Sequence, residues 1–85
     1  MATKMLRLPS VRSCTGKSKS TIYQQIKTGL FPPPVPIGPR ATAWSDDEVD
    51  ATNRAWLAGK SPEQIRRIVA NLVAVRTVTA LGVQS

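Results

Sequence analysis

The sequence contains no histidine and a single cysteine, Cys14, among its 85 residues. One cysteine excludes a disulfide within the chain, and a lone thiol without any imidazole excludes an ordinary structural zinc site. We therefore expect neither a metal nor a cofactor. Such cysteine usage fits a reducing compartment, so we expect a cytoplasmic protein.

Carboxylates are missing from the first half of the chain, residues 1–44. The cations of this segment are Lys4, Arg7, Arg12, Lys17, Lys19, Lys27 and Arg40. In residues 45–85 five cations balance five carboxylates, so the whole formal charge of +7 belongs to the first half. A compact region of one sign attracts a polyanion, and interspersed polar side chains can read base edges. This charge distribution predicts nucleic acid as the partner.

Long apolar runs are also missing. The longest apolar stretch, residues 68–75, is interrupted by Asn71 and is too short to span a bilayer. No apolar run of signal-peptide length follows the N-terminus, and the basic half lacks a strong amphipathic helix rich in aromatics. We therefore expect no membrane partner. A chain of this length forms one small domain, which a partner subunit can stabilise.

Two short helices with their own start and stop signals are predicted in the basic half. The first covers residues 8–15 and ends at Gly16. The second covers residues 19–28, between Ser18 as N-cap and Gly29 as the C-terminal stop. The tight turn between them makes the pair a helix-turn-helix.

A proline-rich segment follows, and residues 31–34 cannot be helical. Residues 35–37 and 41–44 are interpreted as the two strands of a β-hairpin, or wing, with Arg40 at its tip. The prolines also form a P-x-x-P pattern typical of SH3 ligands. Between two apolar residues, however, this pattern favours a rigid connector.

A third helix is expected to start at a capping box formed by Ser45 and Glu48, to run to Ala58 and to bury Val49 and Trp56. The acidic residues of its first turns are explained by capping and the helix dipole, without any catalytic or metal-binding role.

A fourth helix is expected to start at a second capping box, formed by Ser61 and Gln64. Its apolar stripe comprises Ile65, Ile68, Val69, Leu72, Val73 and Val75. The stripe either closes the core or pairs with another subunit, and the pattern leaves both open. Residues 77–79 are β-branched and are expected to fray.

These elements predict a mainly α fold with a small β-hairpin wing. Residues 5–58 form a winged helix-turn-helix that binds DNA, and residues 61–77 form a C-terminal amphipathic helix that closes the core or oligomerises. The candidate DNA-binding residues are Lys17, Ser18, Lys19, Ser20, Thr21, Tyr23, Gln24, Lys27 and Arg40. Gln24 can bond bidentately to adenine, lysines neutralise phosphates, and Arg40 works from the minor groove. The alternative is an ordinary solvated helix face, against which the ring of Tyr23 packs.

Several short motifs occur in a characteristic order over about residues 5–51. They are Leu-Arg-Leu-Pro at 6–9, Thr-Gly-Lys-Ser-Lys-Ser-Thr-Ile-Tyr at 15–23, Lys-Thr-Gly at 27–29, Phe-Pro-Pro-Pro-Val at 31–35, Ile-Gly-Pro-Arg-Ala at 37–41, Trp44 and Glu48-Val49. This order resembles the AlpA family of phage and prophage regulators, close to MerR-type and excisionase-type winged helices. Family members usually have an apolar residue in place of Lys17. Many also have a tryptophan in place of Thr52, whereas here Trp56 comes one turn later.

The resemblance implies a DNA-binding protein that activates or represses phage genes, or directs excision. We predict a non-enzymatic regulator on double-stranded DNA in the bacterial nucleoid, with self-association through the C-terminal helix as a further expectation. An excisionase that bends attachment-site DNA remains an alternative. So does a packaging adaptor such as a terminase small subunit.

Overall fold

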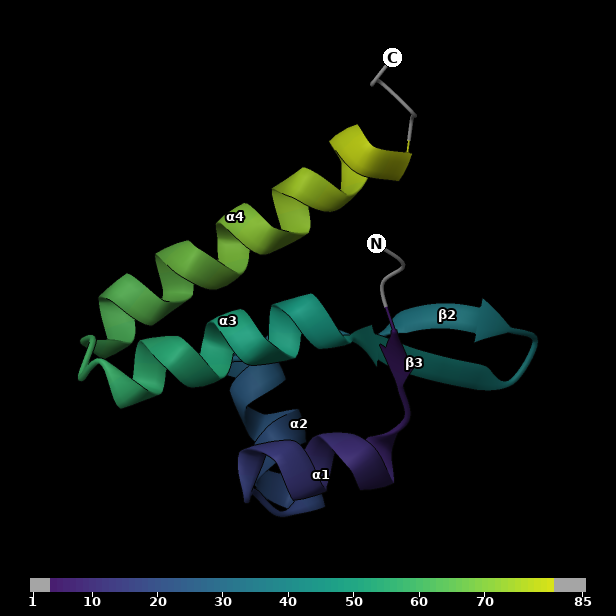
Figure 1. Ribbon diagram of the computed structural model, residues 1–85, viewed down its shortest axis with the longest axis horizontal. Coiled ribbons are helices and arrows are strands. Elements are labelled where there is room, and N and C mark those ends of the chain that lie inside the picture. The colour runs from purple at the N-terminus through teal and green to yellow at the C-terminus, as the bar shows by residue number, and fades with distance from the viewer. Residues whose placement is uncertain (1–3, 81–85) are drawn as a thin grey trace.

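The computed structural model describes the chain from Lys4 to Ala80, with side-chain positions up to Arg76. Its elements are β1 (Met5–Leu6), α1 (Leu8–Thr15), α2 (Lys19–Thr28), β2 (Val35–Gly38), β3 (Ala41–Ser45), α3 (Asp46–Leu57) and α4 (Pro62–Ala80). The hairpin of β2 and β3 projects away from the helices, while α3 and α4 lie side by side and antiparallel (Figure 1). The predicted fold, a helix-turn-helix with a β-hairpin wing, is confirmed.

Local capping signals set the ends of α1 and α2. Gly16 and Gly29 both adopt the left-handed conformation, with φ of 70° and 81°, which a residue without a Cβ reaches without strain. At the start of α2, the Ser18 hydroxyl accepts a hydrogen bond from the backbone N–H of Thr21 at 3.2 Å. The predicted N-cap and both helix stops are therefore confirmed.

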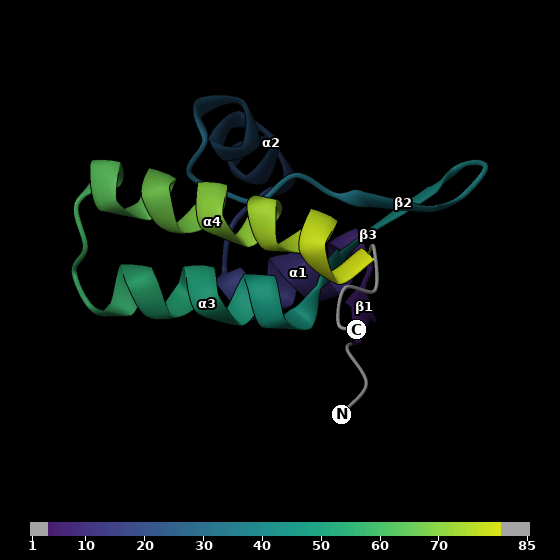
Figure 2. The same ribbon diagram turned by 90° about the horizontal axis from the view of Figure 1, so that it is seen from above.

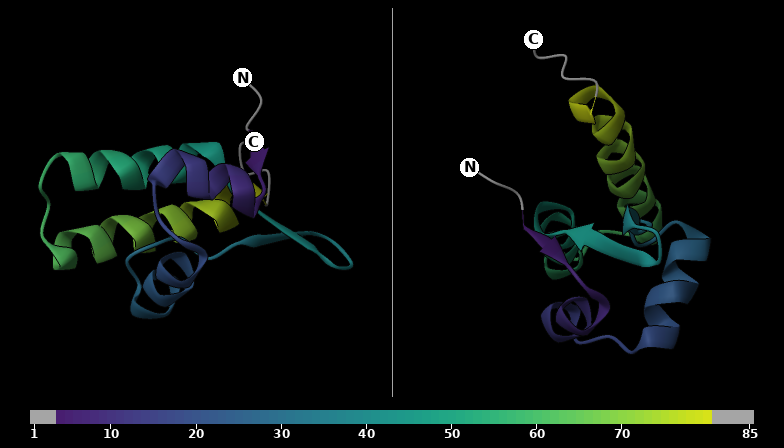
Figure 3. Two further views of the ribbon diagram at one scale, coloured as in Figure 1. Left: turned by 90° about the horizontal axis from the view of Figure 1, so that it is seen from below. Right: turned by 90° about the vertical axis from the view of Figure 1, so that its right-hand side faces the viewer.

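The sheet contains one strand more than predicted. Its order is β1-β3-β2 and all pairings are antiparallel, with Leu6 opposite Trp44 and Val35 opposite Ala43. The strand β1 has only two residues, which is too short for a recognisable alternating pattern. Seen end-on, α1 and α2 lie on one side of the sheet and α4 on the other (Figure 3).

Two apolar clusters form the core. The first contains Val11, Ile22, Phe31, Trp44 and Val49, and the second contains Ala55, Ile65 and Val69, with Leu30 and Ile68 packed against it. The first cluster joins the helix-turn-helix to the sheet and to α3, and the second joins α3 to α4. The first part of α4 therefore closes the core of this chain.

Two expectations about the third and fourth helices were wrong. Trp56, predicted to be buried, is 37% exposed, because the small Ala55 occupies the position that faces α4. Trp56 therefore lies about 100° further round the helix, where its ring meets the side chain of Lys17. The other correction concerns residues 77–79, which belong to α4 and were expected to fray.

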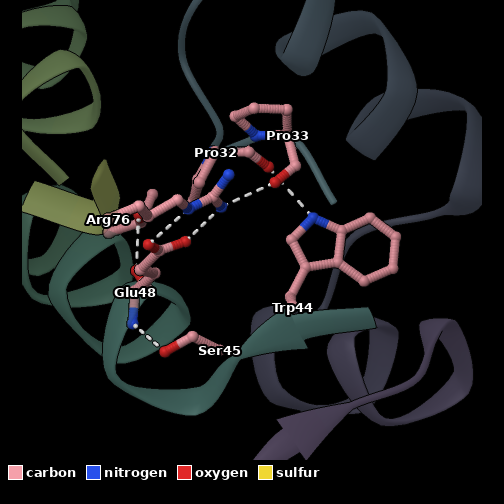
Figure 4. A network of polar contacts seen from close by, with 7 residues as sticks. Pro32, Pro33, Trp44, Ser45, Glu48 and Arg76 are labelled. Atoms are coloured by element: carbon pink, nitrogen blue, oxygen red, sulfur yellow. Dashed lines mark hydrogen bonds and ion pairs between the residues drawn. The ribbon is translucent and has the colours of Figure 1, made fainter. Parts of the chain in front are cut away.

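A partly buried ion pair ties the last part of α4 to the start of α3 (Figure 4). Arg76 donates from Nε to Glu48 Oε2 at 2.7 Å, and its Nη2 donates both to Glu48 Oε1 and to the carbonyl of Pro33, the latter at 2.7 Å. The indole N–H of Trp44 donates to the neighbouring Pro32 carbonyl at 3.0 Å. The proline segment is thus a rigid connector whose carbonyl groups are bonded from both sides.

Only half of the first predicted capping box is formed. The hydroxyl of Ser45 accepts from the backbone N–H of Glu48 at 3.4 Å, but the carboxylate of Glu48 is turned toward Arg76. The second box is formed in full, because Ser61 and Gln64 exchange hydrogen bonds of 2.9 and 3.2 Å.

We expect Arg76→Met to lower the free energy of unfolding by roughly 2–4 kcal/mol, because it leaves the Glu48 carboxylate buried without its partner. The matched control is Arg54→Met, which removes an exposed pair with Asp50 at 2.9 Å and should change stability by less than about 1 kcal/mol. Chemical denaturation followed by circular dichroism measures both. Equal losses in the two variants would contradict a structural role for the Arg76 pair.

Candidate nucleic-acid interface

The helix α2 presents a continuous polar face to solvent. Lys19, Ser20, Gln24 and Lys27 are exposed, while Ile22 on the opposite face is fully buried in the first core cluster. These spacings of three and four residues place the exposed side chains next to one another on one helix surface. Tyr23 lies in the same surface and is 39% exposed. Five of the predicted contact residues therefore share one face.

Hydrogen bonds hold both ends of α2. At its start, the hydroxyl of Ser18 donates to Thr21 Oγ1 at 3.0 Å in addition to accepting from the Thr21 backbone. At its end, the carbonyl of Thr28 accepts from Nε of Arg66 in α4 at 2.9 Å. Ser18 and Thr21, both predicted to contact DNA, thus order the first turn of the helix.

The side chain of Lys17 points into the protein. Its ammonium donates to Gln25 Oε1 at 2.6 Å and lies 4.7 Å from the ring centroid of Trp56 and 5.5 Å from that of Phe31. Burial lowers the pKa of Lys17 from its ordinary value of 10.5, because the ammonium loses part of its hydration. This placement differs from the phosphate contact that the sequence led us to expect.

Arg40 stands in the turn at the tip of the wing, between β2 and β3. Pro39 precedes it and restricts the backbone of the turn. Arg40 is exposed, and the hairpin that carries it extends beyond the helical part of the molecule (Figure 1). Seen from above, α2 and the hairpin tip lie toward the same side, away from α3 (Figure 2).

Arg12 is a candidate that sequence reasoning missed. It is exposed in the last turn of α1 and lines a shallow hollow with Ser13, Gly16 and Ser18 at the start of α2. Free backbone N–H groups and the helix dipole favour an anion at such a place. The charge of Arg12 was visible in the sequence, but its position beside the start of α2 follows from the geometry of the turn between α1 and α2.

The electrostatic character of this surface is uniform. The elements α1, α2 and β2, the turn after β2 and the strand β3 contain no carboxylate at all, because the first acidic residue is Asp46. The carboxylates begin in α3, whose first turn contains Asp46, Asp47 and Glu48. The exposed helix and the wing tip can therefore approach a polyanion without like-charge repulsion.

A helix-turn-helix followed by a β-hairpin wing, with Arg40 at the tip of the wing, gives this protein the architecture of a winged helix-turn-helix. Residues 4–59 match the family described as "Prophage CP4-57 regulatory protein (AlpA)". The chain therefore belongs to the AlpA family of prophage regulatory proteins. The helix α4 begins at Pro62 and lies beyond the matched residues.

A relative from Enterobacteria phage P4 supports the same membership. The chain is 44% identical over 57 residues to a protein named "Uncharacterized protein ORF88", and the match covers 67% of this chain and 60% of the relative. The match thus spans less than two thirds of that relative's length.

No solved structure is significantly similar to the chain. Between Lys4 and Ala80, no helix is both long and apolar enough to cross a membrane.

The two serines at the start of α2 should behave differently when each is changed to alanine. We expect Ser18→Ala to lower the free energy of unfolding by about 1 kcal/mol, because it removes the N-cap. Ser20→Ala removes an exposed hydroxyl within the helix and should change stability by less than about 0.5 kcal/mol. Thermal unfolding of both variants measures the difference, and a larger loss for Ser20→Ala would contradict the assignment of the cap.

Proposed function

We propose that this protein is a sequence-specific DNA-binding regulator of phage or prophage genes. In this proposal α2 enters the major groove and the wing lies against the adjacent minor groove. One observation supports it above the others. The exposed face of α2 and the tip of the wing carry cations and hydrogen-bonding side chains without a single carboxylate, in a member of a regulatory family.

In this proposal, some of the exposed residues of α2 and the wing tip contact the DNA backbone, and others contact the bases. Lys19 and Lys27 neutralise phosphates on either side of the groove, and Arg40 grips the minor groove or its flanking phosphate. Gln24 and Ser20, which lie between the two lysines, reach base edges. Tyr23 donates its phenolic hydroxyl to a phosphate while its ring rests on the helix surface.

A single recognition helix reads only a few base pairs, so selectivity requires several copies on repeated sites. The C-terminal part of α4 is the proposed contact between copies. Ile65 and Val69, nearer the start of the helix, are buried within the chain, whereas Val75 is 58% exposed. A transcription regulator and a factor that directs excision would use the same surface. Mapping the bound DNA sites and measuring the DNA bend would distinguish these two functions.

The electrostatic part of the proposal is tested by salt dependence. Changing Lys19, Lys27 or Arg40 singly to alanine should weaken binding to every DNA sequence and reduce the slope of log affinity against log salt by about one. Lys60→Ala is the control, because Lys60 is an exposed lysine in the turn between α3 and α4. Titrations at four or more salt concentrations provide the slopes. Unchanged slopes for all three variants would exclude this surface.

The reading part is tested by comparing two DNA sequences. Gln24→Ala should weaken binding to the preferred site by roughly 1–3 kcal/mol, the value of one bidentate base contact, and leave binding to random DNA almost unchanged. The preferred site is obtained first by selection from a random library. Equal losses on the preferred site and on random DNA would assign Gln24 to backbone contact or to the fold.

A further inference from the structure

The Lys17 side chain connects three parts of the structure that meet behind the recognition helix. Lys17 itself lies in the turn between α1 and α2. Its ammonium contacts Gln25 within α2, Phe31 just after α2 and Trp56 in the last turn of α3. One side chain therefore joins the turn before α2, the middle of α2 and the last turn of α3.

Two of these contacts are with aromatic rings that lie outside α2. Phe31 is fully buried and packs edge-on against Trp44, with ring centroids 6.4 Å apart and an interplanar angle of 62°. Trp56 is held by the backbone of α3, which the second core cluster anchors to α4. The ammonium thus lies near two aromatic rings that belong to segments outside α2, where cation–π attraction favours it.

The third contact transmits this fixed position to α2. Gln25 follows Gln24 in the chain, and successive residues of an α-helix are rotated by about 100° around its axis. Holding the Gln25 amide oxygen at 2.6 Å from the Lys17 ammonium therefore restrains the rotation of the helix further, in addition to the burial of Ile22. That rotation decides where Gln24 and Ser20 point.

We propose that Lys17 is a positioning residue, which through Gln25 and Trp56 holds α2 at the rotation that aims its reading residues at the DNA. The inference rests on the proposed DNA-binding function and adds how the reading helix is oriented. Lys17 does not touch the DNA in this mechanism. Its contribution is to selectivity, whereas that of Lys19 and Lys27 is to attraction.

The environment of the ammonium agrees with this role. Partial burial lowers the pKa of Lys17, so the aromatic faces and the Gln25 oxygen replace only part of the lost hydration. An apolar side chain of the same length would fill the space without that penalty. The charge is therefore explained better by the geometry that it imposes than by added stability.

The experiment compares Lys17→Met, Trp56→Leu and the double variant in full-length protein, on the preferred site and on random DNA over a range of salt. Met keeps the length of the side chain and removes the charge. We expect each single variant to lose about tenfold in affinity for the preferred site, the order of one lost base contact, with random DNA and the salt slope unchanged. The double variant should lose no more than either single one, because both break the same connection.

Lys17→Arg and Trp56→Phe serve as conservative variants, because each retains a cation or an aromatic face at its position. Both should keep most of the preference for the selected site. A merely space-filling role predicts instead that Lys17→Met, which keeps the length of the side chain, retains the preference as well. Circular dichroism confirms that all variants are folded. In the wild type, the ε-protons of Lys17 should also show an upfield ring-current shift that disappears in Trp56→Leu.

Three results would overturn the inference. The first is a salt slope reduced by about one in Lys17→Met, with equal losses on both DNA sequences, because a phosphate contact behaves in this way. The second is a double variant whose loss equals the product of the two single losses. The third is a Lys17→Met variant whose affinities for the preferred site and for random DNA equal those of the wild type. A wild-type chain without any sequence preference contradicts the proposed function itself and is thereby distinguished from all three.

Discussion

The arrangement of this fold depends on the bonds that Arg76 makes with Glu48 and Pro33. These bonds join the last part of α4, the first turn of α3 and the connector that leads into the wing. The Glu48 side chain is only 9% exposed, and its charge is tolerated there because the guanidinium meets both carboxylate oxygens. The wing root and the α3–α4 pair are thereby fixed to one another, although Arg76 lies outside the segment that matches the AlpA family.

The helix α2 is positioned from several directions at once. The Ser18 cap orders its first turn, the Thr28 carbonyl is bonded by Arg66 of α4, and Ile22 fixes its inner face in the core. The exposed face is therefore left to side chains that contribute little to the fold. This separation lets such a surface vary in sequence while the scaffold behind it stays the same.

Most of the fold could be predicted because its signals are local. The glycine stops, the serine caps and the proline connector act within a few residues, and the structure has them as expected. The features that could not be predicted depend on contacts between residues far apart in the sequence. They are the pairing of the two-residue strand β1 with β3, the ion pair of Glu48 with Arg76, and the contact of the Lys17 ammonium with Trp56. The structure also brings Lys17 into contact with Trp56, which lies far along the chain in α3. No local pattern could reveal that these two residues meet.

The small sheet has consequences for how copies of the chain can meet. Its two free edges are β1, with two residues, and β2, with four residues including Pro36, which has no N–H to donate. Among the described residues, neither edge offers a run of unpaired backbone groups long enough to template another strand. In the proposed binding of several copies to neighbouring sites, the copies would therefore meet through side chains and helices without their wings joining into a continuous sheet.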